Sequence, residues 1–167
     1  AERPARNEAV TPAIDCLDIL VLAPIGRDAE LIAKHLGASG LACRQVSSVD
    51  QIAASVQDGV GMAIIGEEAL DASGIAALSC VLSSQPSWSD LPITLLSGTR
   101  RARDTADALA KLGNVTVLER PVHVRTLVSA AEAGLRARKR QYAARSEIAQ
   151  RDQFLAMLGH ELRNPDR

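Results

Sequence analysis

Short apolar runs that alternate with stretches of helical periodicity constrain this chain most. Each run is bounded by Gly, Pro or polar residues and has the length of a strand buried on both faces. The runs occupy residues 19–22, 41–46, 62–65, 91–96 and 115–118. Between them, apolar residues three or four apart predict amphipathic helices. Strands that alternate with helices pair in parallel through right-handed crossovers. We therefore predict an α/β fold with a five-stranded parallel sheet in the flavodoxin-like order 2-1-3-4-5.

The chain divides into three parts by composition. Residues 1–13 are polar and Pro-containing, so we expect a disordered leader. Residues 14–122 hold the alternating pattern and form the expected domain. Residues 123–167 are helical in pattern throughout. Because no Pro interrupts residues 124–163, this part predicts a helix about 60 Å long.

Charge and cysteine content exclude several function classes. The 167 residues carry a net charge of −1, which predicts no affinity for nucleic acid or for an acidic membrane surface. Cys16, Cys43 and Cys80 are not spaced as metal ligands and are expected to be small apolar side chains in a reducing compartment. No run approaches the ~20 apolar residues that span a bilayer, and no secretory signal is found. We therefore predict a cytoplasmic location, with an anchor elsewhere in a longer protein left open.

The C-terminal helix carries two apolar series with a seven-residue spacing, which favours a left-handed coiled coil. The first series is Val128, Leu135, Tyr142, Ala149 and Ala156, and the second is Ile148, Leu155 and Leu162. We expect a parallel homodimer through residues 124–163, with a weak, polar middle near Arg138, Arg145 and Asp152. The alternative is one long solvated helix, ordered only at its base. The basic residues 136–140 are expected to form a solvated helix face.

The last turns of this helix place a histidine and a glutamate side by side, shortly before Asn-Pro. The apolar residues around them lie three or four apart: Phe154, Leu155, Leu158 and Leu162. This segment resembles the phosphoacceptor box of sensor histidine kinases. The resemblance implies that His160 accepts the γ-phosphoryl group of ATP and that Glu161 hydrogen-bonds the imidazole or acts as a general base. It further implies that Asn164 faces the nucleotide or catalytic domain and that Pro165 bends the helix. An isolated histidine here would more simply be an exposed helical side chain; these neighbours favour the phosphoacceptor.

The sequence departs from that family after Pro165, where Asp166 and Arg167 follow instead of an apolar residue and a second helix. It also contains no nucleotide-binding Gly motif. We therefore expect a fragment of a kinase that is inactive alone and holds no cofactor, whereas the full protein is expected to use ATP and Mg²⁺. The expected partners are a second copy of the chain and a response regulator or other receiver domain.

The α/β part resembles the receiver domain of two-component signalling proteins. The resemblance rests on Leu91-Pro92-Ile93 leading to Ser97, and on Val117-Leu118-Glu119-Arg120-Pro121-Val122. An active receiver needs an acidic pair after the first strand for Mg²⁺, an Asp at the end of the third strand as phosphoryl acceptor, and a Lys after the fifth. This sequence has Ala23 and Pro24, Gly66, and Arg120 at those positions, and Ser97 alone fits.

We therefore expect a pseudo-receiver, a receiver scaffold kept for protein contact. Glu67 and Glu68 are expected to lie in a solvated loop or to cap the next helix rather than to replace the missing Asp. Two functions stay open. The first is the regulatory fragment of a cytoplasmic sensor histidine kinase, and the second is a non-enzymatic module that binds a response regulator or a kinase. A working receiver, phosphorylated with Mg²⁺ by a small donor, is not expected.

Overall fold

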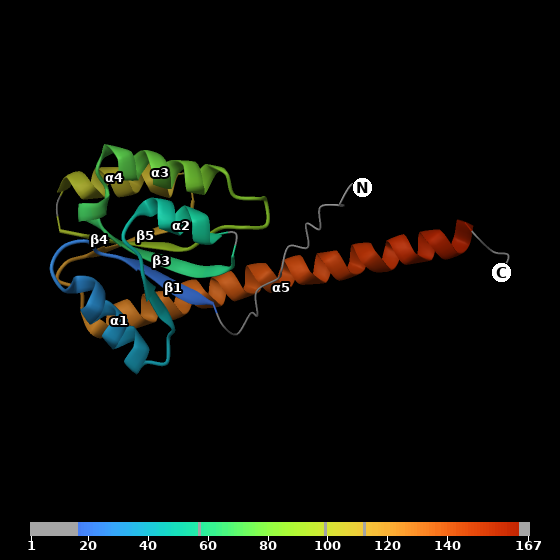
Figure 1. Ribbon diagram of the computed structural model, residues 1–167, viewed down its shortest axis with the longest axis horizontal. Helices are drawn as coiled ribbons and strands as arrows, with labels where there is room; N and C mark the ends of the chain where they lie inside the picture. The colour runs from blue at the N-terminus through green and yellow to red at the C-terminus, as the bar shows by residue number, and fades with distance from the viewer. Residues whose placement is uncertain (1–16, 57, 99, 112, 164–167) are drawn as a thin grey trace, which may run out of the picture.

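Five parallel strands and their crossover helices form the body of the molecule, from which one long helix projects (Figure 1). The computed structural model describes residues 17–56, 58–98, 100–111 and 113–163. In chain order the elements are β1 (Asp18–Leu22), α1 (Asp28–Ala38), β2 (Cys43–Gln45), α2 (Val49–Val56), β3 (Val60–Gly66), the 3₁₀ helix η2 (Glu67–Ala69), α3 (Ala72–Ser83), β4 (Ile93–Ser97), α4 (Arg100–Ala110), β5 (Val115–Glu119) and α5 (Val124–Arg163). The sheet order is β2-β1-β3-β4-β5, which confirms the predicted fold. The expected leader lies outside the described residues.

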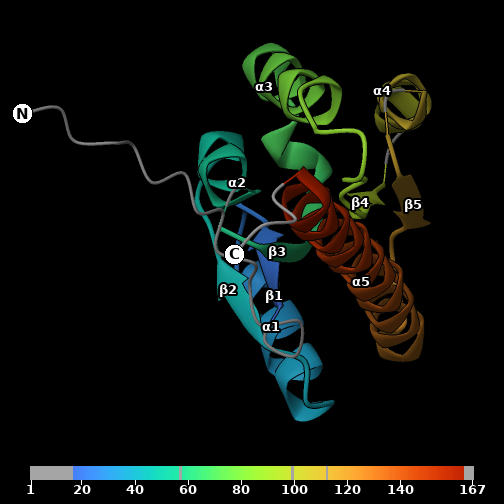
Figure 2. The same cartoon turned by 90° about the vertical axis from the view of Figure 1, so that its right-hand side faces the viewer.

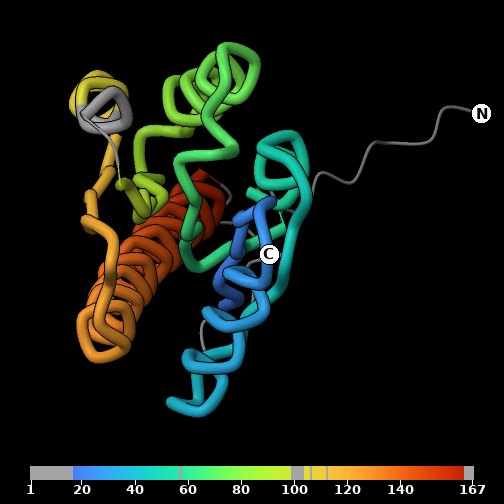
Figure 3. The backbone as a smooth tube through the Cα atoms, turned by 90° about the vertical axis from the view of Figure 1, so that its left-hand side faces the viewer, coloured from blue at the N-terminus to red at the C-terminus, as the bar shows by residue number. Residues whose placement is uncertain are grey.

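Helices cover both faces of the sheet. α1 and α5 lie on one face, and α2, α3 and α4 lie on the other, as the views along α5 show (Figures 2 and 3). Each face has its own apolar core, and β1 contributes to both. Leu20 and Leu22 pack toward α2 and α3, whereas Ile19 and Val21 pack toward α1 and α5. Because successive side chains of a strand point to opposite faces, a strand covered on both sides must be apolar throughout.

Local polar contacts explain where two helices begin. The Asp71 carboxylate accepts a hydrogen bond from the Gly74 amide at 2.7 Å and caps α3. The Ser48 hydroxyl accepts from the Gln51 amide at 3.3 Å at the start of α2, and the Gln51 side chain accepts from the Ser47 amide at 2.9 Å. Each contact satisfies a backbone donor that has no partner within its helix.

Each strand differs from its predicted range by one or two residues at an end. The difference is largest for β2, which has three residues where 41–46 was predicted.

α5 has a docked half and a projecting half. Its buried residues are Leu127, Ala131, Leu135, Arg138 and Tyr142, spaced as one helical face. From Glu147 to Arg163 every residue is exposed. Glycine permits the close docking: a Cβ on Gly61 of β3 would lie 2.5 Å from Leu135 Cδ2.

The burial of this face corrects part of the expected dimer seam. Leu135 is 8% exposed and Tyr142 is 2% exposed, and Val128 packs against the same core. Leu135 and Tyr142 are covered by their own chain and Val128 is partly covered, so this face is docked on the domain rather than left open for a partner helix. A seven-residue spacing marks one face of a helix, but it does not say whether a sheet or a second helix covers that face. Ala149, Leu155 and the other members beyond them lie in the projecting half.

Arg138 also differs from expectation. The sequence predicts a solvated basic face here, yet the exposed fraction of Arg138 is 0%. Its neighbours Arg136 and Arg140 are exposed.

Among the described residues, no helix combines the length and the apolar character that a membrane span needs.

Candidate functional site

The carboxyl ends of four strands meet at one edge of the sheet. There Ala23 and Pro24 follow β1, Gly66 ends β3, Ser97 ends β4, and Arg120 comes directly after β5. The parallel register places these strand ends side by side. The fold thus brings together all five positions that the receiver resemblance singled out.

Gly66 stands where that resemblance places a phosphoryl-accepting Asp. A Cβ at Gly66 would lie 2.6 Å from Glu68 Oε2 and 3.1 Å from Arg120 Nη2. The space in which an acceptor side chain would begin is therefore taken by two charged groups of the chain itself.

Glu67 turns back toward the end of β4. Its Oε2 accepts hydrogen bonds from the Ser97 hydroxyl at 3.3 Å and from the Gly98 amide at 3.0 Å. The expectation of a solvated carboxylate was wrong for Glu67. η2 begins at Glu67, so the chain turns directly after β3 and the side chain reaches the end of β4.

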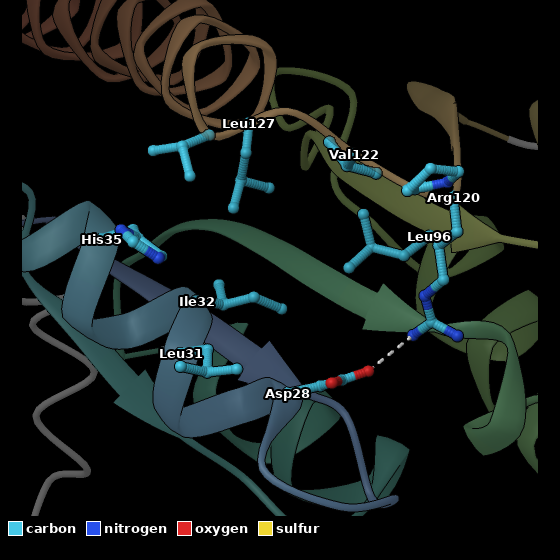
Figure 4. A pocket seen from close by; sticks show the side chains of 10 residues that line it. Asp28, Leu31, Ile32, His35, Leu96, Arg120, Val122 and Leu127 are labelled. Carbon is cyan, nitrogen blue, oxygen red and sulfur yellow. Dashed lines mark ion pairs between the residues drawn. The ribbon is translucent and has the colours of Figure 1, made fainter.

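Glu68 forms a two-pronged ion pair with Arg120. Both terminal nitrogens of Arg120 donate to the Glu68 carboxylate, with Nη2 to Oε2 at 3.2 Å. Asp28 Oδ2, at the start of α1, lies 3.5 Å from Nη2 of the same guanidinium (Figure 4). The hydrogen bond from Arg120 lowers the pKa of Glu68, and the same bond raises the pKa of Arg120. Each partner thus keeps the other charged.

These residues do not fit the Mg²⁺ site that the resemblance implies. Mg²⁺ needs several oxygen ligands in a near-octahedral arrangement. Ala23, Pro24 and Gly66 have no side-chain oxygen, and Glu67 and Glu68 are bound to hydroxyl, amide and guanidinium donors. In the part of the chain that the structure describes, no three His, Cys, Asp or Glu side chains are grouped as a metal site.

A cavity of about 550 Å³ lies beside Arg120, between α1 and the start of α5 (Figure 4). Most of its lining is apolar, and Asp28, His35 and Arg120 supply its ionisable groups. The apolar lining consists of Leu31, Ile32, Leu96, Pro121, Val122, Val124 and Leu127. The ion-paired edge of the sheet therefore borders an open apolar surface.

His160 and Glu161 lie in the last turn of α5 and are exposed. At 1.5 Å per residue, His160 is about 54 Å along the helix from Val124. The structure does not bring this pair together with the edge of the sheet. Asn164 and Pro165 lie outside the described residues.

Comparison with known proteins gives matches in structure alone, since no known protein family and no curated protein matches the sequence. A response regulator receiver domain from Clostridium thermocellum matches with a TM-score of 0.63 at 20% identity, over 74% of this chain and 98% of its own. The receiver domain of NtrX from Brucella abortus matches with a TM-score of 0.60 at 25% identity, over 71% of this chain and 98% of its own. This part of the chain has the receiver fold.

The match therefore covers nearly the whole of these isolated receiver domains, but only a small share of a longer regulator. A longer NtrX structure matches with a TM-score of 0.61 at 23% identity, and the chain spans 28% of it. The roles of Glu67, Glu68 and Asp28 at this edge of the sheet were not predicted from the sequence. The available signal was a pair of carboxylates directly after the third strand, in a position from which a turn could aim them at Ser97 and Arg120.

Proposed function

We propose that this chain is the regulatory fragment of a cytoplasmic sensor histidine kinase, in which a receiver-like domain that accepts no phosphoryl group holds a helix bearing the phosphoacceptor His160. The observation that carries the proposal is the continuity of α5. It starts five residues after β5 of the receiver-like domain and runs unbroken through the His160–Glu161 pair. In this proposal a catalytic domain outside these 167 residues binds ATP and Mg²⁺ and transfers the γ-phosphoryl group to His160.

The contacts at the strand edge support a domain without phosphoryl chemistry. By the family resemblance, the Ser97 hydroxyl and the Arg120 cation occupy positions that contact a phosphoryl group. Here Glu67 accepts from Ser97, and Glu68 binds Arg120. Carboxylates of the chain itself thus satisfy the donors that a phosphoryl group would use. In this proposal the domain serves to dock and orient α5.

The projecting half of α5 supports a second copy of the chain as a partner. Its exposed apolar residues include Ile148, Leu155, Leu158 and Leu162. At 3.6 residues per turn, the centre of this stripe lies about 130° around the helix from the face that docks on the sheet. A partner helix can therefore cover the stripe while the domain stays docked. Apolar side chains at such spacing are typical of a coiled-coil seam.

The test is phosphoryl labelling by the catalytic domain of a histidine kinase with Mg-ATP, and by phosphoramidate as a small donor. We expect label on His160, because its imidazole is exposed and a ring nitrogen can act as the nucleophile. His160→Gln should remove the label. His123→Gln, which changes an exposed histidine just before α5, is the matched control and should keep it. Label that survives His160→Gln, or no label from either donor, contradicts the assignment.

The same assay with acetyl phosphate and Mg²⁺ tests the receiver-like domain separately. We expect no acyl phosphate on residues 14–122, because Gly66 offers no acceptor side chain and the described residues beside it do not fit a metal site. Label on a carboxylate of this domain would overturn the pseudo-receiver half of the proposal and leave the His160 half untouched.

The alternative is a non-enzymatic module that binds a response regulator or kinase. The open apolar cavity between α1 and α5 favours this alternative. Binding of such a partner at fixed salt should then be weakened by Leu31→Glu, which changes the cavity lining, and should be unaffected by His160→Gln.

A further inference from the structure

The loop between α3 and β4 meets α5 through a cluster of aromatic rings and guanidinium groups. Trp88 of this loop and Tyr142 of α5 have ring centroids 5.2 Å apart. The Arg138 guanidinium lies 4.8 Å from the Tyr142 ring centroid and 5.5 Å from that of Trp88. The Arg145 guanidinium lies 4.4 Å from the Trp88 ring centroid. The chain has three aromatic side chains, so two of them meet at this one contact.

Arg138 is buried, and it donates hydrogen bonds to uncharged groups. Its Nε donates to the Val60 carbonyl at 3.1 Å, and its Nη1 donates to the Ser89 hydroxyl and to Gln141 Oε1, both at 2.8 Å. Its Nη2 lies 3.4 Å from the Tyr142 hydroxyl. Among the described residues no salt bridge to Arg138 is found. Burial lowers the pKa of Arg138, but a guanidinium stays protonated in proteins. Neutral hydrogen-bond acceptors, two ring faces and the nearby charge of Asp90 therefore stabilise the buried cation.

Gln141 joins the same loop to α5 a second time. Its Nε2 donates to the Asp90 carbonyl at 2.8 Å, and its Oε1 accepts from the Asp90 amide at 2.9 Å. The loop is itself braced by Gln85 Oε1, which accepts from the Ser89 hydroxyl and from the Leu91 amide. These contacts connect the loop, the start of β3 and α5 into one unit.

We propose that residues 85–91, named here the clamp loop, grip α5 through Arg138 and Trp88 and so set the point at which the domain-held part of the helix ends. The burial along α5 supports this assignment. Arg145 and Ser146 are the last partly buried residues of α5. Every residue from Glu147 to Arg163 is exposed. The projecting rod is then about 25 Å long. The grip on α5 does not depend on whether His160 accepts a phosphoryl group.

The chemistry of the grip requires arginine. A guanidinium has five donors in a planar fork and can stack on rings, whereas a lysine ammonium is a compact, strongly hydrated charge. Arg138→Lys therefore keeps the charge but removes the fork that spans Val60, Ser89 and Gln141. The matched control is Arg136→Lys, two residues earlier on the same helix and exposed.

The test is amide hydrogen exchange along the whole chain, read together with the fluorescence of Trp88, the single tryptophan. In Arg138→Lys we expect exchange of residues 138–146 to rise at least about tenfold toward that of residues 150–160, while β1 and β3 keep their protection. Trp88 emission should shift to the red, and its quenching by acrylamide should increase. Arg136→Lys should leave both readouts unchanged.

Two results would overturn the proposal. One is Arg138→Lys behaving like Arg136→Lys, and the other is an equal loss of protection in residues 138–146 and throughout the sheet, which would make Arg138 an ordinary core residue. If Arg138→Lys does not fold, Arg145→Gln provides the same test at a partly exposed position. It should raise exchange at residues 142–146 and expose Trp88, and wild-type behaviour there would equally refute the grip.

Discussion

At the scale of single residues, Glu67 and Glu68 decide the chemistry of the strand edge. They are adjacent in sequence, yet they bind different groups: one binds the Ser97 hydroxyl and the Gly98 amide, and the other binds the Arg120 guanidinium. The absence of an acceptor at Gly66 could be read from the sequence. The sequence did not show that Glu67 and Glu68 fill the space around Gly66, because their positions depend on the turn that η2 makes directly after β3.

The Glu68–Arg120 pair predicts a pH-dependent stability. Because Arg120 lowers the pKa of Glu68 in the folded chain, the pair stabilises the fold above the 4.5 of an unperturbed glutamate. That stability is lost as the pH falls from about 4.5 through the lower folded value. Glu68→Gln should therefore cost about 1 kcal/mol at pH 7 and flatten the decline between pH 5 and pH 3. Urea unfolding of both proteins at pH 7, 5 and 3 measures the difference.

The control for this change is an exposed ion pair of the same type. Arg27 Nε and Glu30 Oε2 lie 3.1 Å apart, and the two side chains are 81% and 60% exposed. Glu30→Gln should change the free energy of unfolding by less than about 0.5 kcal/mol. If Glu68→Gln costs no more than this control at pH 7, the pair does not hold the strand edge together.

At the scale of elements, α5 has the same helical spacing of apolar residues in its docked half and in its exposed half. Its apolar residues recur with helical spacing along the whole length, but the first half packs on the sheet and the second half is exposed. The docked half could be assigned only after the sheet was in place. Gly61 and Gly134 mark the contact, because a Cβ at either would come within 3 Å of a side chain on the other element.

Gly61→Ala should destabilise the protein by about 1–3 kcal/mol, as overpacking does. The added methyl would lie 2.5 Å from Leu135 Cδ2 and 3.0 Å from the Asp18 carbonyl oxygen, and that backbone atom cannot move without disturbing β1. Thermal or urea unfolding measures the loss. Gly37→Ala is the matched control, since it lies within α1 with open space around it. Alanine there should be neutral or should stabilise by up to about 1 kcal/mol. Equal stability of the two variants would contradict a tight contact between β3 and α5.

At the scale of the whole molecule, a receiver-like domain sits at one end of a rod whose far half is exposed (Figure 1). We predict that the chain dimerises through this far half at tens of micromolar, because dimerisation buries the exposed stripe of Leu155, Leu162 and their neighbours. Leu155→Glu combined with Leu162→Glu should give a monomer in light scattering or sedimentation, with the domain still folded.

Ile25→Glu is the control for this experiment, since Ile25 is a comparably exposed apolar residue between β1 and α1. It should leave the dimer intact. A wild-type chain that stays monomeric at these concentrations, or a dimer that survives both substitutions on α5, would remove the helix as the dimer contact.

The sequence by itself determined the elements of this protein and their order. Alternating apolar runs, turn residues and helical spacing are local signals, and the rule for parallel strands converts them into one sheet topology. It also placed Ala23, Pro24, Gly66, Ser97 and Arg120 at strand ends, which share one edge in any such sheet.

The tertiary structure alone decided which side chains meet. Arg120 and Glu68 are 52 residues apart in sequence, and Arg138 is 78 residues from Val60. No local pattern links residues so far apart, because their contact depends on how separate elements pack and on where a turn redirects the chain. For the same physical reason, the face of α5 could be recognised in the sequence, whereas the surface that covers it could be found only in the fold.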